Sequence, residues 1–159
     1  MTYEGLARLA PDVQAALRAM TKAVDESGLD KDLTELVKVR ASQLNGCAFC
    51  LQFHLTLARR LGVPAAKLDL AAAWRDAGVF SAREMAALAY VEALTRLADH
   101  EVMLAAQDNV LQHFSADEAR FLTIAIATIN AWNRLAISLR AEAGKYHPQA
   151  QAKEVRKTA

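Results

Sequence analysis

Apolar residues recur at helical spacing along nearly the whole chain, and this periodicity limits the possible folds most strongly. After Asp30, the residues Leu33, Leu36 and Val37 return every three or four positions, with charged side chains between them. No run of useful length alternates apolar and polar residues, as a half-buried strand would. The pattern therefore predicts an all-α fold.

Capping and turn-forming residues divide the chain into about six or seven predicted helices. Pro11 is placed to open the first of them. Two later helices begin with a serine three residues before a glutamate, Ser81 with Glu84 and Ser115 with Glu118. This spacing is typical of a capping box, in which side chain and backbone bond in both directions.

Length and charge limit the class of protein and its partners. The chain has 159 residues, of which 53% are hydrophobic, enough for one domain with a real core. Lysine and arginine number 19 against 18 acidic residues, and no dense basic run occurs, so neither nucleic acid nor a membrane is a predicted partner. We expect a single-domain helical bundle over residues 1–159, with a polar, mobile tail at 145–159.

The sequence predicts a cytoplasmic protein. The N-terminus lacks the basic-then-apolar pattern of a signal peptide, and no apolar stretch approaches the roughly 18 residues of a membrane-spanning helix. Cytoplasmic thiols are mostly reduced, so a permanent structural disulfide would be unusual there. A close Cys-x-x-Cys pair in that compartment indicates redox chemistry or metal binding.

Cys47, Cys50 and His54 are spaced by three and four residues, which places their side chains on one face of a helix. A modest adjustment would let the two cysteines form a disulfide. The Asn45-Gly46 turn indicates that Cys47 begins the helix, where free N–H groups and the helix dipole favour a thiolate. His54 lies one turn from Cys50, at a position suited to exchanging a proton with it.

The spacing alone leaves more than one interpretation open. Redox chemistry is favoured, but the three residues and one carboxylate would also make a tetrahedral zinc site, and the cysteines could be incidental. The strands of a thioredoxin-like protein are missing, and Leu51 excludes the motif for covalent haem attachment. The remaining histidines have no partners at ligand spacing and receive no role: His100, His113 and His147.

The segment from Glu35 to His54 closely resembles the core motif of the alkylhydroperoxidase AhpD-like proteins, which belong to the carboxymuconolactone decarboxylase superfamily. The motif is a glutamate, eleven residues, Cys-x-x-Cys, three residues and a histidine. The resemblance covers most of the chain, and residues 30–62 decide it. It implies an AhpD-like helical fold and a homo-oligomer, often a dimer, trimer or hexamer.

The resemblance also implies a function, thiol-dependent reduction of peroxides. Cys50 would be the peroxidatic cysteine, Cys47 the resolving one, and His54 with Glu35 a proton relay. The expected partners are a peroxide substrate and an external thiol, dithiol or reductase protein, with no metal, flavin or nicotinamide cofactor. True decarboxylases of the superfamily lack the cysteine pair, which argues against lactone decarboxylation.

Two assignments have a rival, and we favour Cys50 as the attacking thiol, because the nearby base His54 is the more direct activation, and the relay role for Glu35. The helix dipole favours Cys47 as the more acidic thiol, whereas the resemblance favours Cys50 as the attacking one. Glu35 could instead belong to an Asp32-x-x-Glu35 capping box. The rival functions are a non-catalytic thiol redox sensor or interaction protein, and a zinc-stabilised helical module.

Several other side chains receive structural interpretations. Lys38 and Arg40 are expected to be surface charges. Phe49 and Phe53 either line an apolar pocket for an alkyl peroxide or pack half-buried. Core or subunit-interface positions are predicted for the remaining large aromatic residues near the motif and in the last helix, namely Trp74, Phe121 and Trp132.

Overall fold

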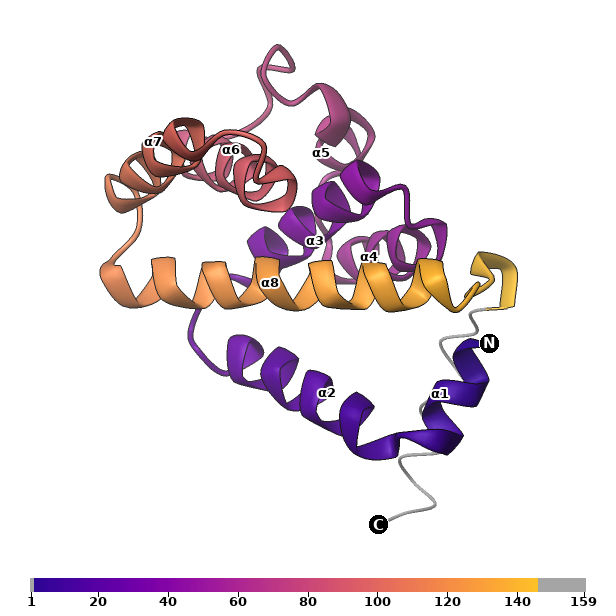
Figure 1. Cartoon of the computed structure of the whole chain (residues 1–159). Helices are drawn as coiled ribbons and strands as arrows, with labels where there is room; N and C mark the ends of the chain where they lie inside the picture. The colour runs from indigo at the N-terminus through magenta and orange to yellow at the C-terminus, as the bar shows by residue number, and fades with distance from the viewer. Residues whose placement is uncertain (1, 146–159) are drawn as a thin grey trace.

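The computed structural model describes residues 2–145, with Ala7 and Lys145 described by their backbone only. Within this range the chain forms eight α-helices, two short 3-10 helices and no strand, which confirms the all-α prediction (Figure 1). The predicted mobile tail lies outside the described residues from position 146 onwards. The elements are α1 (Tyr3–Leu9), α2 (Pro11–Asp25), α3 (Lys31–Asn45), α4 (Ala48–Leu61), α5 (Ala65–Leu70), η1 (Ala71–Ala73), α6 (Ala82–Arg96), α7 (His100–Leu111), α8 (Ala116–Ser138) and η2 (Ala143–Lys145).

Local capping explains where several of these helices begin. Both predicted capping boxes are confirmed: Ser81 caps α6 and Ser115 caps α8, each accepting a hydrogen bond from a glutamate backbone N–H at 3.2 Å. Pro11 opens α2, as predicted. α1 was not predicted. This seven-residue helix is capped by the side chain of Thr2, which accepts from the N–H of Gly5.

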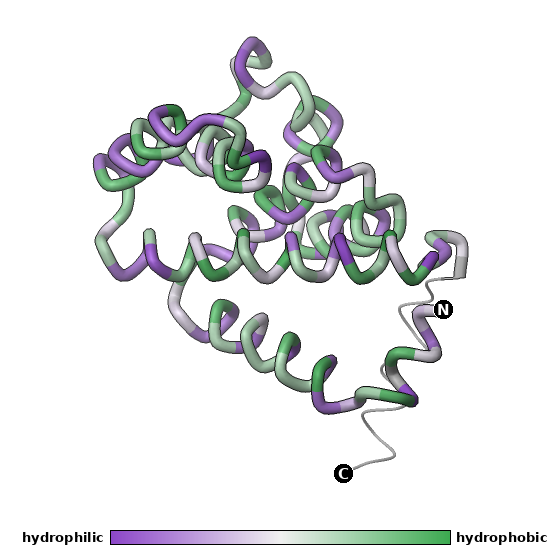
Figure 2. Tube along the Cα trace, in the orientation of Figure 1, coloured by the Kyte–Doolittle hydropathy of each residue, from purple (hydrophilic) through white to green (hydrophobic). Residues whose placement is uncertain are grey.

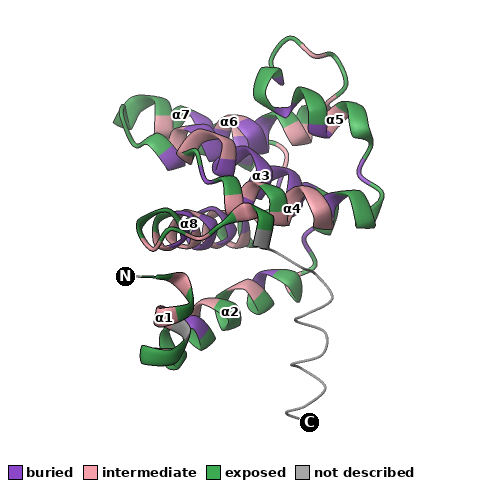
Figure 3. Cartoon of the chain, turned by 90° about the vertical axis from the view of Figure 1, so that its right-hand side faces the viewer, coloured by how far each residue is buried: buried purple, intermediate pink, exposed green. Residues whose placement is uncertain are grey.

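The central element is α3, which contacts α4, α6 and α8. Buried residues gather on α3, α6 and α8, whereas most of α2 is exposed (Figure 3). α8 runs across the molecule and separates α2 from α3, α4 and α6 (Figure 1). No helix among residues 2–145 is long and apolar enough to cross a membrane.

The N-terminal helices form a short arm on one side of α8: α2 packs against α8, and α1 packs against α2 (Figure 1). α2 carries hydrophobic residues along its length (Figure 2), yet only Gln14 and Val24 of this helix are buried. The main cavity described below lies between this arm and the body of the protein, because residues of α1 and α2 line it together with residues of α3, α4 and α8.

The prediction that Lys38 and Arg40 are surface charges is wrong, because neighbouring helices cover α3 on several sides. Their side chains are only 7% and 10% exposed. Arg40 donates to Glu92 of α6 at 2.6 and 2.8 Å, and Trp74 donates its indole N–H to the same oxygen at 2.9 Å. These bonds satisfy a buried charge that would otherwise be strongly destabilising. Trp74 is a core residue, as predicted.

Candidate active site

The corner between α3 and α4 sets the position of the two cysteines. Gly46 ends α3 with φ of 68°, a left-handed conformation that favours glycine. Cys47 is the N-cap of α4, and its sulfur accepts a hydrogen bond from the backbone N–H of Cys50 at 3.4 Å. The prediction that Cys47 begins the helix is confirmed. Both cysteines are free thiols and almost fully buried.

Glu35 on α3 faces His54 on α4. Its Oε2 lies 2.7 Å from His54 Nδ1, and its Oε1 accepts from Lys38 Nζ at 2.8 Å. The capping alternative for Glu35 is wrong, since α3 begins at Lys31 and the carboxylate points to these two partners instead. Asp30 occupies the N-cap position without a side-chain capping bond.

The electrostatic setting of Glu35 determines how His54 holds its proton. Burial alone would raise the pKa of Glu35, but the hydrogen bond from His54 and the charges of His54 and Lys38 hold it below its ordinary value. An ionised carboxylate can only accept, so Nδ1 of His54 carries a hydrogen. In the neutral ring, the other nitrogen, Nε2, is then the one without a hydrogen.

The two thiols differ in acidity. A hydrogen bond from the Cys50 thiol lowers the pKa of Cys47 to about 7, and the backbone N–H groups of Cys50 and Phe49 act in the same direction against burial. Donating that bond raises the pKa of Cys50, and burial adds to the effect. The lower pKa therefore falls on the cysteine at the helix terminus, as the helix-dipole argument predicts.

Asn133 of α8 also contacts this site and was not assigned from the sequence. Its side chain is fully buried and hydrogen-bonds Cys50, which lowers the pKa of that thiol against the stronger effect of Cys47. Asn45 donates to Asn133 Oδ1 at 2.8 Å, and Asn133 donates to Ser42 at 3.2 Å. The signal in the sequence was an amide on an otherwise apolar helix face, flanked by Ile129 and Ala136.

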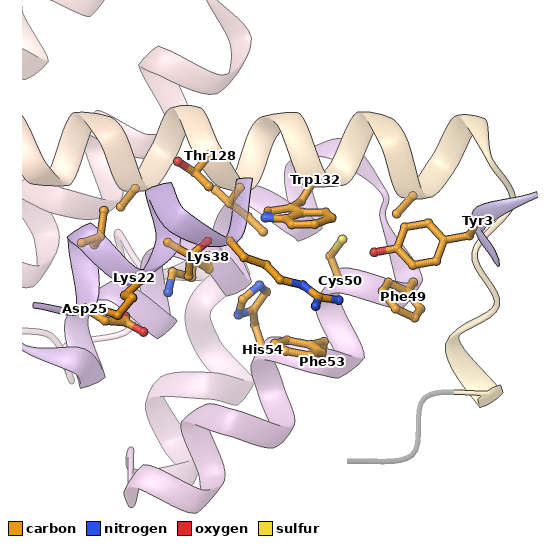
Figure 4. A pocket seen from close by; sticks show the side chains of 16 residues that line it. Tyr3, Lys22, Asp25, Lys38, Phe49, Cys50, Phe53, His54, Thr128 and Trp132 are labelled. Carbon is orange, nitrogen blue, oxygen red and sulfur yellow. The ribbon is translucent and has the colours of Figure 1, made fainter. Parts of the chain in front are cut away.

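A cavity of about 790 Å³ opens beside the cysteine pair (Figure 4). Cys50 and His54 line it, whereas Cys47 does not. Phe49 and Phe53 are half-buried and line it too, and so does Trp132, which was predicted as a core or interface residue. The remaining lining residues are Tyr3, Arg18, Thr21, Lys22, Val24, Asp25, Lys38, Ala125, Thr128, Ile129 and Ala136.

The zinc interpretation finds no support in the described part of the chain. Among residues 2–145, no three cysteine, histidine, aspartate or glutamate side chains come together in an arrangement that could hold a metal ion. Glu35, the carboxylate nearest to His54, is already bonded to Lys38 as well.

Comparison with known proteins identifies the family. A model of the carboxymuconolactone decarboxylase family matches residues 11–93, which include Glu35, both cysteines and His54. An uncharacterized protein of Bacillus subtilis, YdfG, is 31% identical over 131 residues, covering 82% of this chain and 89% of that protein. The chain therefore belongs to the carboxymuconolactone decarboxylase family.

Solved structures agree with this assignment and with the AhpD-like fold. A protein of unknown function from Agrobacterium tumefaciens, provisionally assigned as the antioxidant defence protein AhpD, superposes with a TM-score of 0.83 at 34% identity. The alignment covers 89% of this chain and 97% of that protein. An uncharacterized peroxidase-related protein from Silicibacter is 25% identical, with a TM-score of 0.67 over 79% of this chain and 67% of its own.

A more distant neighbour is the debrominase Bmp8, solved in complex with 2,3,4-tribromopyrrole. It is 22% identical to this chain, with a TM-score of 0.75 over 92% of this chain and 78% of its own. This likeness shows the shared fold.

The acidity of the two thiols can be measured directly. We expect absorbance at 240 nm to report one thiolate that forms with a midpoint near pH 7, because Cys47 is the more acidic thiol. The thiolate is present above that pH and lost below it. The transition should survive in Cys50→Ser, whose hydroxyl can still donate to Cys47, and disappear in Cys47→Ser. A transition that persists in Cys47→Ser would assign the acidic thiol to Cys50 instead.

Proposed function

We propose that this protein is a thiol-dependent hydroperoxide reductase that cycles between a Cys47–Cys50 dithiol and a disulfide. The observation that carries the proposal is the position of Cys50. Its side chain lines the cavity beside His54, and it hydrogen-bonds a second thiol. A peroxide in the cavity would therefore meet a sulfur with a proton acceptor and a resolving thiol next to it.

The first step is activation of Cys50. The Cys47 proton passes to solvent or to Nε2 of His54, whose imidazolium is stabilised by the ionised Glu35. The Cys47 thiolate then accepts the proton of Cys50 through their hydrogen bond. Cys50 becomes the thiolate, and Asn133 stabilises its charge. In this scheme the acidic cysteine is the base and the cysteine in the cavity is the nucleophile.

The second step is oxidation. The Cys50 thiolate attacks the terminal oxygen of the hydroperoxide, the O–O bond breaks, and Cys50 becomes a sulfenic acid. The alkoxide that leaves takes a proton from the imidazolium of His54, or from solvent if the Cys47 proton was released there, and departs as an alcohol. Cys47, now a thiol, attacks the Cys50 sulfur and releases water as the disulfide forms.

An external dithiol completes the cycle. It reduces the disulfide by thiol–disulfide exchange, giving up two electrons and two protons and leaving as its own disulfide. The names of the relatives support the proposal, since one is provisionally an antioxidant AhpD protein and another is peroxidase-related.

Replacing Cys47 with serine separates the two oxidation steps. We expect Cys47→Ser to form a stable sulfenic acid on Cys50, detectable by dimedone and intact mass, because no thiol remains to resolve it. Oxidation should be slower near neutral pH, since the base is lost, and catalytic turnover should fall to background. Cys50→Ser is the control and should form no sulfenic acid. Unchanged turnover in Cys47→Ser would contradict the two-cysteine scheme, and oxidation without turnover in the native protein would favour the redox sensor.

A test of Glu35 must separate its effect on proton transfer from its effect on the stability of the fold. Glu35→Gln would leave Lys38 buried without a counter-ion, which costs about 3–5 kcal/mol of unfolding free energy. We expect it also to slow Cys50 oxidation by about a hundredfold, because His54 loses its carboxylate.

The double variant Glu35→Gln with Lys38→Met removes both charges. Its unfolding midpoint in urea should recover towards the native value while oxidation stays slow. Lys38→Met alone, which keeps the Glu35–His54 bond, controls for the loss of the lysine. If the rate recovers together with stability in the double variant, Glu35 has a structural role and the relay is wrong.

A further inference from the structure

The cavity has two ends of different character (Figure 4). Lys22 and Asp25 lie together at one end, Tyr3 and Phe49 lie at the other, and Cys50 and His54 lie between them. The wall near the reactive sulfur is aromatic and includes Phe53. An organic molecule with an apolar body fits such a wall.

The lysine and arginine side chains that line the cavity differ in whether a carboxylate neutralises them. Lys22 forms an ion pair with Glu26, and Lys38 of α3 is neutralised by Glu35. Arg18 lines the cavity as well, and among residues 2–145 it has no carboxylate within ion-pair distance. Asp25 is seven residues further along α2, about 10 Å away at the rise of an α-helix. Arg18, an exposed residue of α2, is therefore the cation of the cavity wall that no carboxylate of the described residues neutralises.

Tyr3, at the aromatic end of the cavity, is near enough to Arg18 to interact with its charge. The positive charge of Arg18 acts on the phenol of Tyr3, which also senses both cysteines. Burial raises the pKa of Tyr3, so its hydroxyl keeps a proton and can donate a hydrogen bond. The Tyr3 ring packs against Phe49 with centroids 5.3 Å apart. Arg18 and Tyr3 thus both supply hydrogen-bond donors to the wall of the cavity that Cys50 lines.

We propose that the cavity selects hydroperoxides of carboxylic acids, with Arg18 binding the carboxylate and the aromatic wall covering the apolar body while the peroxide reaches Cys50. The inference rests on the proposed reductase function and adds a substrate class to it. A single guanidinium matches a carboxylate with two parallel hydrogen bonds.

The test compares a medium-chain fatty-acid hydroperoxide with its methyl ester, which lacks the negative charge and carries one additional methyl group. The reduced full-length protein is assayed for both with dithiothreitol as reductant. We expect kcat/KM to be about tenfold higher for the acid, mainly through a lower KM. Arg18→Gln should raise KM for the acid, so that the ratio of kcat/KM between acid and ester falls to about one. Arg60→Gln, an exposed arginine of α4 outside the cavity, is the charge-matched control and should keep the preference.

The outcomes separate the two proposals. Equal kcat/KM for acid and ester, or a preference that persists in Arg18→Gln, would overturn the assignment of Arg18 and leave the reductase function standing. Failure of the native protein to reduce either compound would overturn the reductase function and the substrate class together. If Arg60→Gln loses the preference for the acid to the same extent, the preference comes from the net charge of the protein and not from Arg18.

Discussion

Glu35 is buried, and the rest of the candidate site depends on the two groups that make its burial possible. Lys38 and His54 each bind one carboxylate oxygen, so the charge is balanced inside the protein. An unpaired carboxylate at 5% exposure would instead take up a proton or destabilise the fold. Because Glu35 stays ionised, it fixes the hydrogen on Nδ1 of His54 and leaves Nε2 for proton exchange. One ion pair on α3 thereby orients a histidine on α4.

The low thiol pKa and the position on the cavity wall belong to different cysteines. Cys47 has the lower pKa because it caps α4 and accepts a hydrogen bond from its neighbour, but it does not line the cavity. Cys50 lines the cavity and has the higher pKa. This separation fits a proton transfer between the two cysteines. The Cys47 thiolate can then act as the base that deprotonates Cys50, the cysteine that lines the cavity. The buried amide of Asn133 supports the charge on Cys50 when it forms.

The sequence predicted the parts of the site that depend on local structure. The helix start at Cys47, the turn at Gly46 and the two serine caps follow from neighbouring residues alone. The spacing of Glu35 and His54 on successive helices was read through a family motif, and the structure brings the two side chains together. The family and the all-α fold are confirmed by the comparisons, whereas the roles of the four motif residues stay predictions.

The sequence did not predict features that depend on how helices pack. Lys38 and Arg40 resembled surface charges because local periodicity does not reveal that α4, α6 and α8 surround α3. Asn133 and Trp132 lie about ninety residues from the motif, and only the packing of α8 brings them to it. The exposure of Arg18 to the cavity depends on where α2 crosses α8. Such long-range packing has no signal in a single sequence.

The most direct test of the central claim counts free thiols in reduced, metal-free protein before and after one equivalent of an alkyl hydroperoxide, with intact mass to identify the product. The account predicts rapid loss of both thiols, a mass lower by two hydrogens, and full recovery of the thiols when a dithiol is added. Thiols that remain unreactive under these conditions, or that form an oxidised product which a dithiol does not restore, would contradict it.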